Sequence, residues 1–146
     1  MLRVEVTEVY PFPRDVVFGF FADPARALAA APPDSGLRLV SILPDGRYEV
    51  EARRWGLTRR IVMRLVEVRP YDLLVEEQEK GPLATWRVER WLRELPGGTE
   101  VRETAEFEAP GGLLGLTLTA ARVEAELRAG YEGRVARVTA LLGGPA

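Results

Sequence analysis

The chain has 146 residues, about the length of one ordinary domain, and can bury a core without disulfides or metal ions. It contains no cysteine and no histidine. This composition excludes disulfides, thiolate and histidine metal sites, cysteine nucleophiles and Ser-His-Asp triads. Any catalysis would have to use carboxylates, tyrosine, arginine or an exogenous cofactor. We predict no catalytic residue, no metal ligand and no cofactor.

The charge is balanced and evenly spread. The net charge is -2, Lys80 is the only lysine, and arginines alternate with glutamates along the chain, which argues against nucleic acid as a partner. No apolar run approaches the roughly 18 to 20 residues that span a bilayer. The N-terminal MLRVEVTEV alternates where a signal peptide has an unbroken apolar block. We expect a cytoplasmic monomer or homodimer without membrane insertion.

The N-terminal part predicts a strand followed by two short helices. Residues 2–10 alternate apolar and polar side chains, as a half-buried strand does. Pro13 suits the start of a helix over residues 14–22. The buried stripe of this helix is predicted to consist of Val16, Val17, Phe20 and Phe21. Asp23 is a suitable N-cap for a second helix over residues 24–30.

Six further strands are predicted before the C-terminal segment. Turn sequences separate them, and Pro44-Asp45-Gly46 and Pro96-Gly97-Gly98 are typical of hairpins. The predicted strands cover residues 37–43, 47–54, 57–68, 73–79, 84–95 and 99–108. Sequential strands joined by short turns form an antiparallel sheet.

The C-terminal segment has the pattern of one long amphipathic helix over residues 113–142. Its apolar face is formed by Leu116, Ala120, Val123, Leu127, Tyr131, Val135, Val138 and Leu142, at spacings of three and four. Such a helix would be about 45 Å long. Gly130 and Gly133 lie inside it and either permit a bend or close approach or are simply tolerated. The order of elements predicts an α+β fold in a single domain, residues 1–146.

The last hairpin indicates which side chains share a face of the sheet. If its turn is symmetric, Leu95 pairs with Gly98. Counting back from this pair gives four further pairs whose side chains share one face of the sheet. They are Leu92 with Val101, Arg90 with Glu103, Val88 with Ala105, and Trp86 with Phe107. This face is apolar except for Arg90 and Glu103. Glu76 on the preceding strand could lie on the same side, whereas Trp91 falls on the opposite face.

Three stretches of the chain carry a family pattern. They are YPFPRDVVFGFFADPARALAAAPP at residues 10–33, LLVEEQEKGPLATW at residues 73–86 and GGTEVRETAEFEAPGGLLG at residues 97–115. They resemble the SRPBCC superfamily, which includes START domains, birch-pollen-allergen-like proteins and bacterial stand-alone ligand-binding proteins related to polyketide cyclases. The resemblance implies a helix-grip fold: a seven-stranded antiparallel sheet wrapped around a long C-terminal helix, with two short helices after the first strand. It also implies a cavity between sheet and helix.

The resemblance favours binding over catalysis. Related stretches often carry two alternating histidines after the tryptophan that corresponds to Trp86, and this chain has Val88 and Arg90 there. Whatever a histidine pair does in relatives cannot happen here.

The apolar face and the inner side of the C-terminal helix supply the candidate ligand-binding residues. They are Met63, Glu76, Trp86, Arg90, Glu103, Phe107, Val123, Leu127 and Tyr131. The polar members would orient a mostly apolar ligand, and arginine suits a carboxylate or phenolate. The Tyr131 hydroxyl is the best candidate on the helix for a hydrogen bond to the ligand. The alternatives are a buried ion pair without a binding role and, for the apolar members, plain core.

Three functions follow from these patterns. The leading hypothesis is a protein that binds or carries a small hydrophobic molecule without catalysis: a lipid, an isoprenoid, or a quinone-like or aromatic polyketide-like compound. The second is a cyclase/aromatase or dehydratase in which Arg90 with Glu103 or Glu76 holds and protonates a carbonyl compound, which needs a carboxyl group of raised pKa. The third is a protein-interaction module with an exposed apolar patch around Trp91. The basic tract around Trp55 is interpreted as a solvated strand edge.

Overall fold

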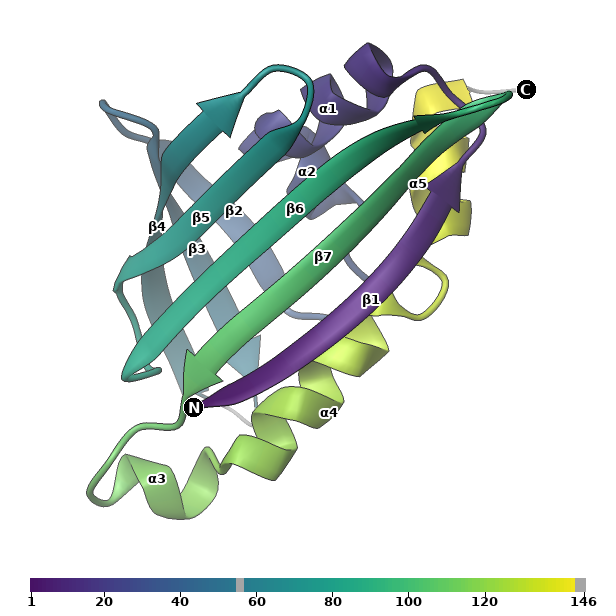
Figure 1. The fold of residues 1–146 in the computed structure, drawn as a ribbon. Coiled ribbons are helices and arrows are strands. Elements are labelled where there is room, and N and C mark those ends of the chain that lie inside the picture. The colour runs from purple at the N-terminus through teal and green to yellow at the C-terminus, as the bar shows by residue number, and fades with distance from the viewer. Residues whose placement is uncertain (55–56, 144–146) are drawn as a thin grey trace.

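The computed structural model describes residues 1–54 and 57–143 and contains a seven-stranded antiparallel sheet (Figure 1). The strands lie side by side in the order β1-β7-β6-β5-β4-β3-β2. They are β1 (Leu2–Tyr10), β2 (Leu37–Ile42), β3 (Arg47–Arg54), β4 (Leu57–Arg69), β5 (Leu73–Lys80), β6 (Thr85–Leu95) and β7 (Gly98–Glu108). The predicted antiparallel sheet is confirmed. The interpretation of Trp55 falls outside the described residues.

The two predicted short helices follow β1. They are α1 (Arg14–Ala22) and α2 (Pro24–Ala29), and the Asp23 side chain caps α2 by accepting a hydrogen bond from Ala25 N at 3.0 Å. The buried stripe of α1 differs by one residue from the prediction. Val16 is 38% exposed and Phe18 is buried, because the face of α1 that meets the sheet is turned toward Phe18.

The β6–β7 hairpin has the register that its turn predicts. Leu95 pairs with Gly98, Arg90 with Glu103, and Trp86 with Phe107. Arg90 also pairs with Leu74 on β5, next to Val88 and Glu76. The inner face predicted from sequence parity is therefore confirmed.

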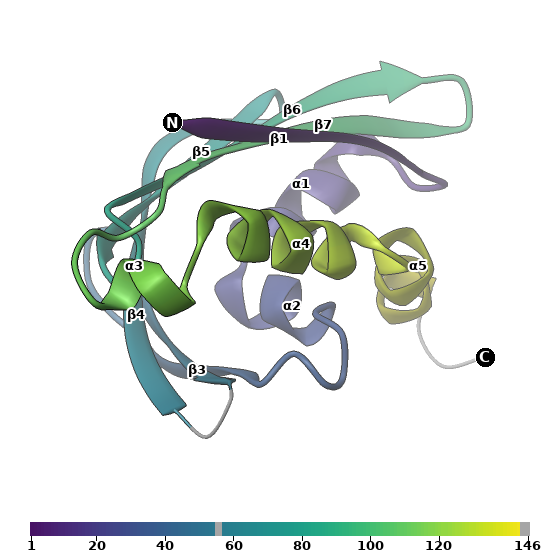
Figure 2. The ribbon, with the colours of Figure 1, turned by 90° about the horizontal axis from the view of Figure 1, so that it is seen from below.

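The sheet is curved, and the helices lie on its concave side. Register shifts interrupt the β2–β3 ladder between Leu39 and Ser41 and the β4–β5 ladder between Leu65 and Glu67. Such irregularities bend and twist the strands. Figure 2 shows the strands curving around α2 and the C-terminal helical segment.

The prediction of one unbroken C-terminal helix is wrong. The segment forms α3 (Leu114–Thr117), α4 (Ala120–Tyr131) and α5 (Arg134–Gly143). Thr119 caps the start of α4, since its side chain accepts a hydrogen bond from Arg122 N at 3.3 Å. At the other end Glu132 is extended and Gly133 has φ +71°, a left-handed conformation that glycine adopts without steric cost. In Figure 2, α4 lies across the concave side and α5 is seen nearly end-on.

A second break, between α3 and α4, separates Leu116 from the apolar face on which it was predicted. Leu116 belongs to α3 and is 75% exposed, because α3 lies before the segment that packs on the sheet. Val123 on α4 and Val138 on α5 are buried as predicted.

The buried side chains form three clusters around the concave face. One joins α1 and α5 to the sheet, around Tyr10, Phe21 and Val138. The second lies under α4, around Phe107 and Val123, and the third lies on β3 and β4, around Met63. Trp86 packs against both the second and the third cluster, so it lies on the floor between them. Within the described ranges no helix combines the length and the apolar character needed to cross a membrane.

Candidate ligand-binding site

A cavity of about 870 Å³ lies between the concave face of the sheet and the helices α2 and α4. Side chains from β3, β4 and β6 line its floor, including Val50, Ile61 and Val88. Leu28 on α2 and Leu127 on α4 line it from the opposite side. Members of all three core clusters line it: Ala30 of the first, Val123 of the second and Met63 of the third.

The cavity brings together all but one of the residues predicted from the sequence. Its lining includes Met63, Glu76, Trp86, Arg90, Glu103, Val123, Leu127 and Tyr131. Phe107 is the exception: it is 0% exposed and does not line the cavity. It lies at the end of β7 where α4 packs directly on the sheet, so Leu83 and Val123 cover it. Phe107 is therefore core.

Arg90 lies at the polar end of the cavity, between two carboxylates. Its Nε donates to Glu103 Oε1 at 2.6 Å, and its Nη1 donates to Glu76 Oε2 at 3.3 Å. The Tyr48 hydroxyl donates to the other oxygen of Glu76 at 3.0 Å. Burial, and then the charge of Glu76, raises the pKa of Tyr48, so this hydroxyl stays protonated and remains a donor.

A second arginine, which the sequence patterns did not indicate, joins this group. Arg134 Nη1, at the start of α5, donates to Glu103 Oε1 at 3.1 Å. Its Nε donates to Glu8 Oε1 at 2.9 Å, and the Tyr10 hydroxyl donates to the same carboxylate, also at 2.9 Å. The guanidinium groups of Arg90 and Arg134 both lie over the Phe21 ring, at 5.1 and 5.6 Å from its centroid.

Glu8 and Arg134 were not predicted from the sequence, and they differ in whether a sequence pattern could have identified them. Glu8 occupies the apolar-face position of β1 that follows Val4 and Val6, and a charge at such a position could have identified it. Arg134 could not be placed in the same way, because the break at Gly133 changes which residues of α5 face the sheet.

The group has a net negative charge. Glu8, Glu76 and Glu103 supply three negative charges, and Arg90 and Arg134 supply two positive charges, which leaves one negative charge in excess. Burial alone would raise the pKa of Glu103, but the charges of Arg90 and Arg134 outweigh it and lower that pKa to about 2. Glu103 is therefore ionised at neutral pH although it is only 3% exposed.

Two buried polar atoms lie in the cavity wall. Among the described residues, the Trp86 indole N–H has no hydrogen-bond partner, whereas the Tyr131 hydroxyl lies beside the Glu103 carboxylate. Burial raises the pKa of Tyr131, and the nearby Glu103 carboxylate raises it further. The Tyr131 ring also stacks on the Arg134 guanidinium, 4.8 Å from the ring centroid. Tyr131 thus lies beside the charged group.

The side chains at the polar end of the cavity do not suit a metal ion. In the described part of the chain, no cluster of three or more acidic side chains is placed to hold one. The carboxylates of the polar end are instead paired with arginines.

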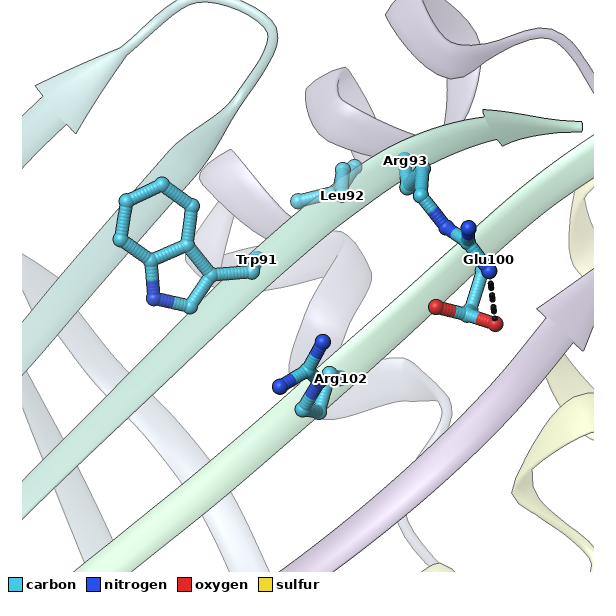
Figure 3. Close-up of a pocket in the computed structure, with 5 residues that line it drawn as sticks. All are labelled: Trp91, Leu92, Arg93, Glu100 and Arg102. Atoms are coloured by element: carbon cyan, nitrogen blue, oxygen red, sulfur yellow. Dashed lines mark hydrogen bonds and ion pairs between the residues drawn. The ribbon is translucent and has the colours of Figure 1, made fainter.

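The outer face of the sheet carries Trp91, as predicted, and a shallow depression beside it. Figure 3 shows Trp91 among Leu92, Arg93, Glu100 and Arg102. Trp91 is 43% exposed, Arg93 pairs with Glu100 at 2.9 Å, and the indole N–H donates to Glu89. Charged side chains lie beside the tryptophan in this depression, namely Arg93, Glu100 and Arg102.

Comparison with known proteins gives the fold. No protein-family model and no curated protein matches the chain. Protein CV1439 from Chromobacterium violaceum is 17% identical with a TM-score of 0.73, covering 98% of each chain. Ara h 8.0201 is 13% identical with a TM-score of 0.70 and 97% of each chain covered. The ZhuI aromatase/cyclase from Streptomyces sp. R1128 is 20% identical with a TM-score of 0.67, covering 97% of this chain and 92% of its own.

These matches confirm the resemblance inferred from the sequence at the level of the fold. The chain has the helix-grip α+β fold of SRPBCC and birch-pollen-allergen-like proteins, with α4 and α5 packed on the sheet.

Proposed function

We propose that this protein binds or carries a small, mainly apolar molecule in the cavity between the sheet and α4, without changing it chemically. The observation that carries the proposal is the cavity of about 870 Å³, whose walls are mainly apolar and which has a buried polar group around Arg90, with further charged side chains such as Asp34 and Arg59 elsewhere in its lining. Ligand sites in proteins typically have about 300 to 1,000 Å³ and combine apolar walls with a few polar groups. A lipid, an isoprenoid, or a quinone-like or aromatic polyketide-like compound would suit such a site in a cytoplasmic carrier.

An enzymatic function is the second candidate, because the similar ZhuI protein is an aromatase/cyclase by name. A carboxyl group that protonates a carbonyl compound must keep its proton near neutral pH, which requires a raised pKa. The two arginines beside Glu103 lower its pKa to about 2. Glu103 is thus a fixed negative charge, and this supports binding over acid catalysis.

Equilibrium dialysis against naphthalene, followed by native mass spectrometry, tests the proposal. Naphthalene is apolar, small enough for the cavity and free of groups that could pair with surface charges. We expect saturable uptake of one equivalent. A protein that takes up no naphthalene, and from which no apolar compound can be extracted after purification, would contradict the proposal.

A further inference from the structure

The charges at the polar end of the cavity bear on which ligands can enter it. Arg90 was expected to suit a carboxylate or phenolate, as a free guanidinium would. In the structure it is already held between Glu103 and Glu76, at 2.6 and 3.3 Å. Arg134 is likewise held between Glu8 and Glu103. Neither cation is left to balance a further anion.

The same group keeps both kinds of hydrogen-bonding capacity. Both arginine partners of Glu103 bind Oε1, so among the described residues Oε2 receives no arginine N–H, and the Tyr131 hydroxyl is the neighbouring donor of this carboxylate. Arg90 Nη2 donates none, since Arg90 uses only Nε and Nη1. Arg90, Glu76 and Glu103 all line the cavity. The polar end therefore offers a carboxylate acceptor and a guanidinium donor that belong to one network of ion pairs.

We infer that the cavity selects an uncharged, mainly apolar molecule that carries a hydroxyl group, and rejects the corresponding carboxylate. This inference rests on the proposed function and adds the chemical class of the ligand's polar group. A hydroxyl can donate to Glu103 or Glu76 and accept from Arg90 Nη2. A carboxylate can only accept, and it would bring a second negative charge into a group that already has one in excess.

The test compares ligands that share one ring system and differ in the polar group. The probes are naphthalene, 2-naphthol, 2-naphthoate and the 2-naphthylmethylammonium ion, titrated into the protein at pH 7 by calorimetry. We expect 2-naphthol to bind more tightly than naphthalene, and 2-naphthoate to bind about tenfold or more weakly than 2-naphthol. The ammonium ion should also bind more weakly than 2-naphthol, because it cannot accept from Arg90 and because removing its charge from water into a mainly apolar cavity costs more than attraction to one excess negative charge returns.

Glu76→Gln tests the electrostatic cause. It removes one negative charge from the polar end and should reduce the preference for 2-naphthol over 2-naphthoate at least about threefold. Glu77→Gln is the matched control, since Glu77 is the next residue of β5, pairs with Arg87 at 2.6 Å on the outer face and changes the net charge equally. It should leave the preference unchanged. If Glu76→Gln does not fold, the comparison of probes on the unmodified protein still decides the question.

The outcomes separate the two proposals. Binding of naphthalene together with equal or tighter binding of 2-naphthoate or the ammonium ion than of 2-naphthol overturns the inference and leaves the carrier function standing. Equal effects of Glu76→Gln and Glu77→Gln on the preference also overturn it. Failure of every probe to bind contradicts the carrier function itself, and the inference with it.

Discussion

The guanidinium of Arg134 on α5 lies 3.1 Å from Glu103 on β7, and this contact links the C-terminal helix to the strand next to the edge strand β1. The same arginine binds Glu8 on β1, so one side chain joins three elements that are far apart in the sequence. Both carboxylates are buried. They would be left without this partner if the arginine were removed.

Arg134→Met should therefore lower the free energy of unfolding by about 3 to 5 kcal/mol, the usual cost of breaking a buried ion pair from one side. Urea denaturation followed by circular dichroism measures it. The control is Arg128→Met, which removes an exposed pair with Glu124 on α4 and should cost less than about 1 kcal/mol. Equal losses in the two variants would show that the buried contact has no special weight.

Acid should weaken the protein through Glu103. The pKa of Glu103 is lowered to about 2 in the folded protein, below its ordinary value of 4.5, so its ionised form favours folding. This contribution is fully present above the ordinary pKa and is lost as the pH falls toward 2. The loss should be on the order of 3 kcal/mol.

Glu103→Gln separates this residue from the other acids that titrate in the same range. The unfolding free energies of the unmodified protein and Glu103→Gln, measured from pH 6 to pH 2, should converge as the pH falls. A difference that stays constant over this range would contradict the assigned role of Glu103.

The left-handed conformation of Gly133 predicts opposite effects for two neighbouring substitutions. Gly133→Ala should destabilise the protein by about 1 to 2 kcal/mol, because φ is +71° and a Cβ atom would lie 3.0 Å from Arg137 Nη1. Gly130→Ala, inside α4 with nothing within 4 Å of the added atom, should stabilise it by about 0.5 to 1 kcal/mol. Thermal denaturation compares both. A stabilising Gly133→Ala would mean that the break between α4 and α5 is not maintained in solution.

Filling the cavity should prevent binding without unfolding the protein. Val88 points from β6 into the cavity between Trp86 and Arg90, so Val88→Phe would place its added volume in empty space. We expect naphthalene affinity to fall about tenfold or more, and stability to change by less than the roughly 1 to 3 kcal/mol that overpacking a filled core costs. Val66→Phe, at an exposed position of β4, is the control and should bind as before. Unchanged affinity in Val88→Phe would place the ligand elsewhere.

The sequence predicted the sheet well because its signals are local. The turn at Pro96-Gly97 determines the register of β6 and β7, and from that register the pairing of Arg90 with Glu103 follows by counting. Pro13 and Asp23 mark the starts of α1 and α2 for equally local reasons. Parity along each strand then placed Trp86 and Arg90 on one face and Trp91 on the other.

The structure of the C-terminal segment was harder to predict, because its apolar spacing continues through the break between α4 and α5. Spacings of three and four relate Tyr131 to Val135 as they would in one helix, and the backbone conformations of Glu132 and Gly133 interrupt that helix. The partners of Arg134 follow from that change of direction. Phe107 is buried because α4 packs on the sheet at this position. No pattern within β7 could indicate where α4 packs.

The most direct test of the central claim is a crystal structure of the protein with naphthalene bound. We expect the ring between the sheet and α4, in contact with Met63, Trp86 and Leu127. A ring bound only on the outer face beside Trp91, or a cavity closed by side chains with no ligand inside, would contradict it.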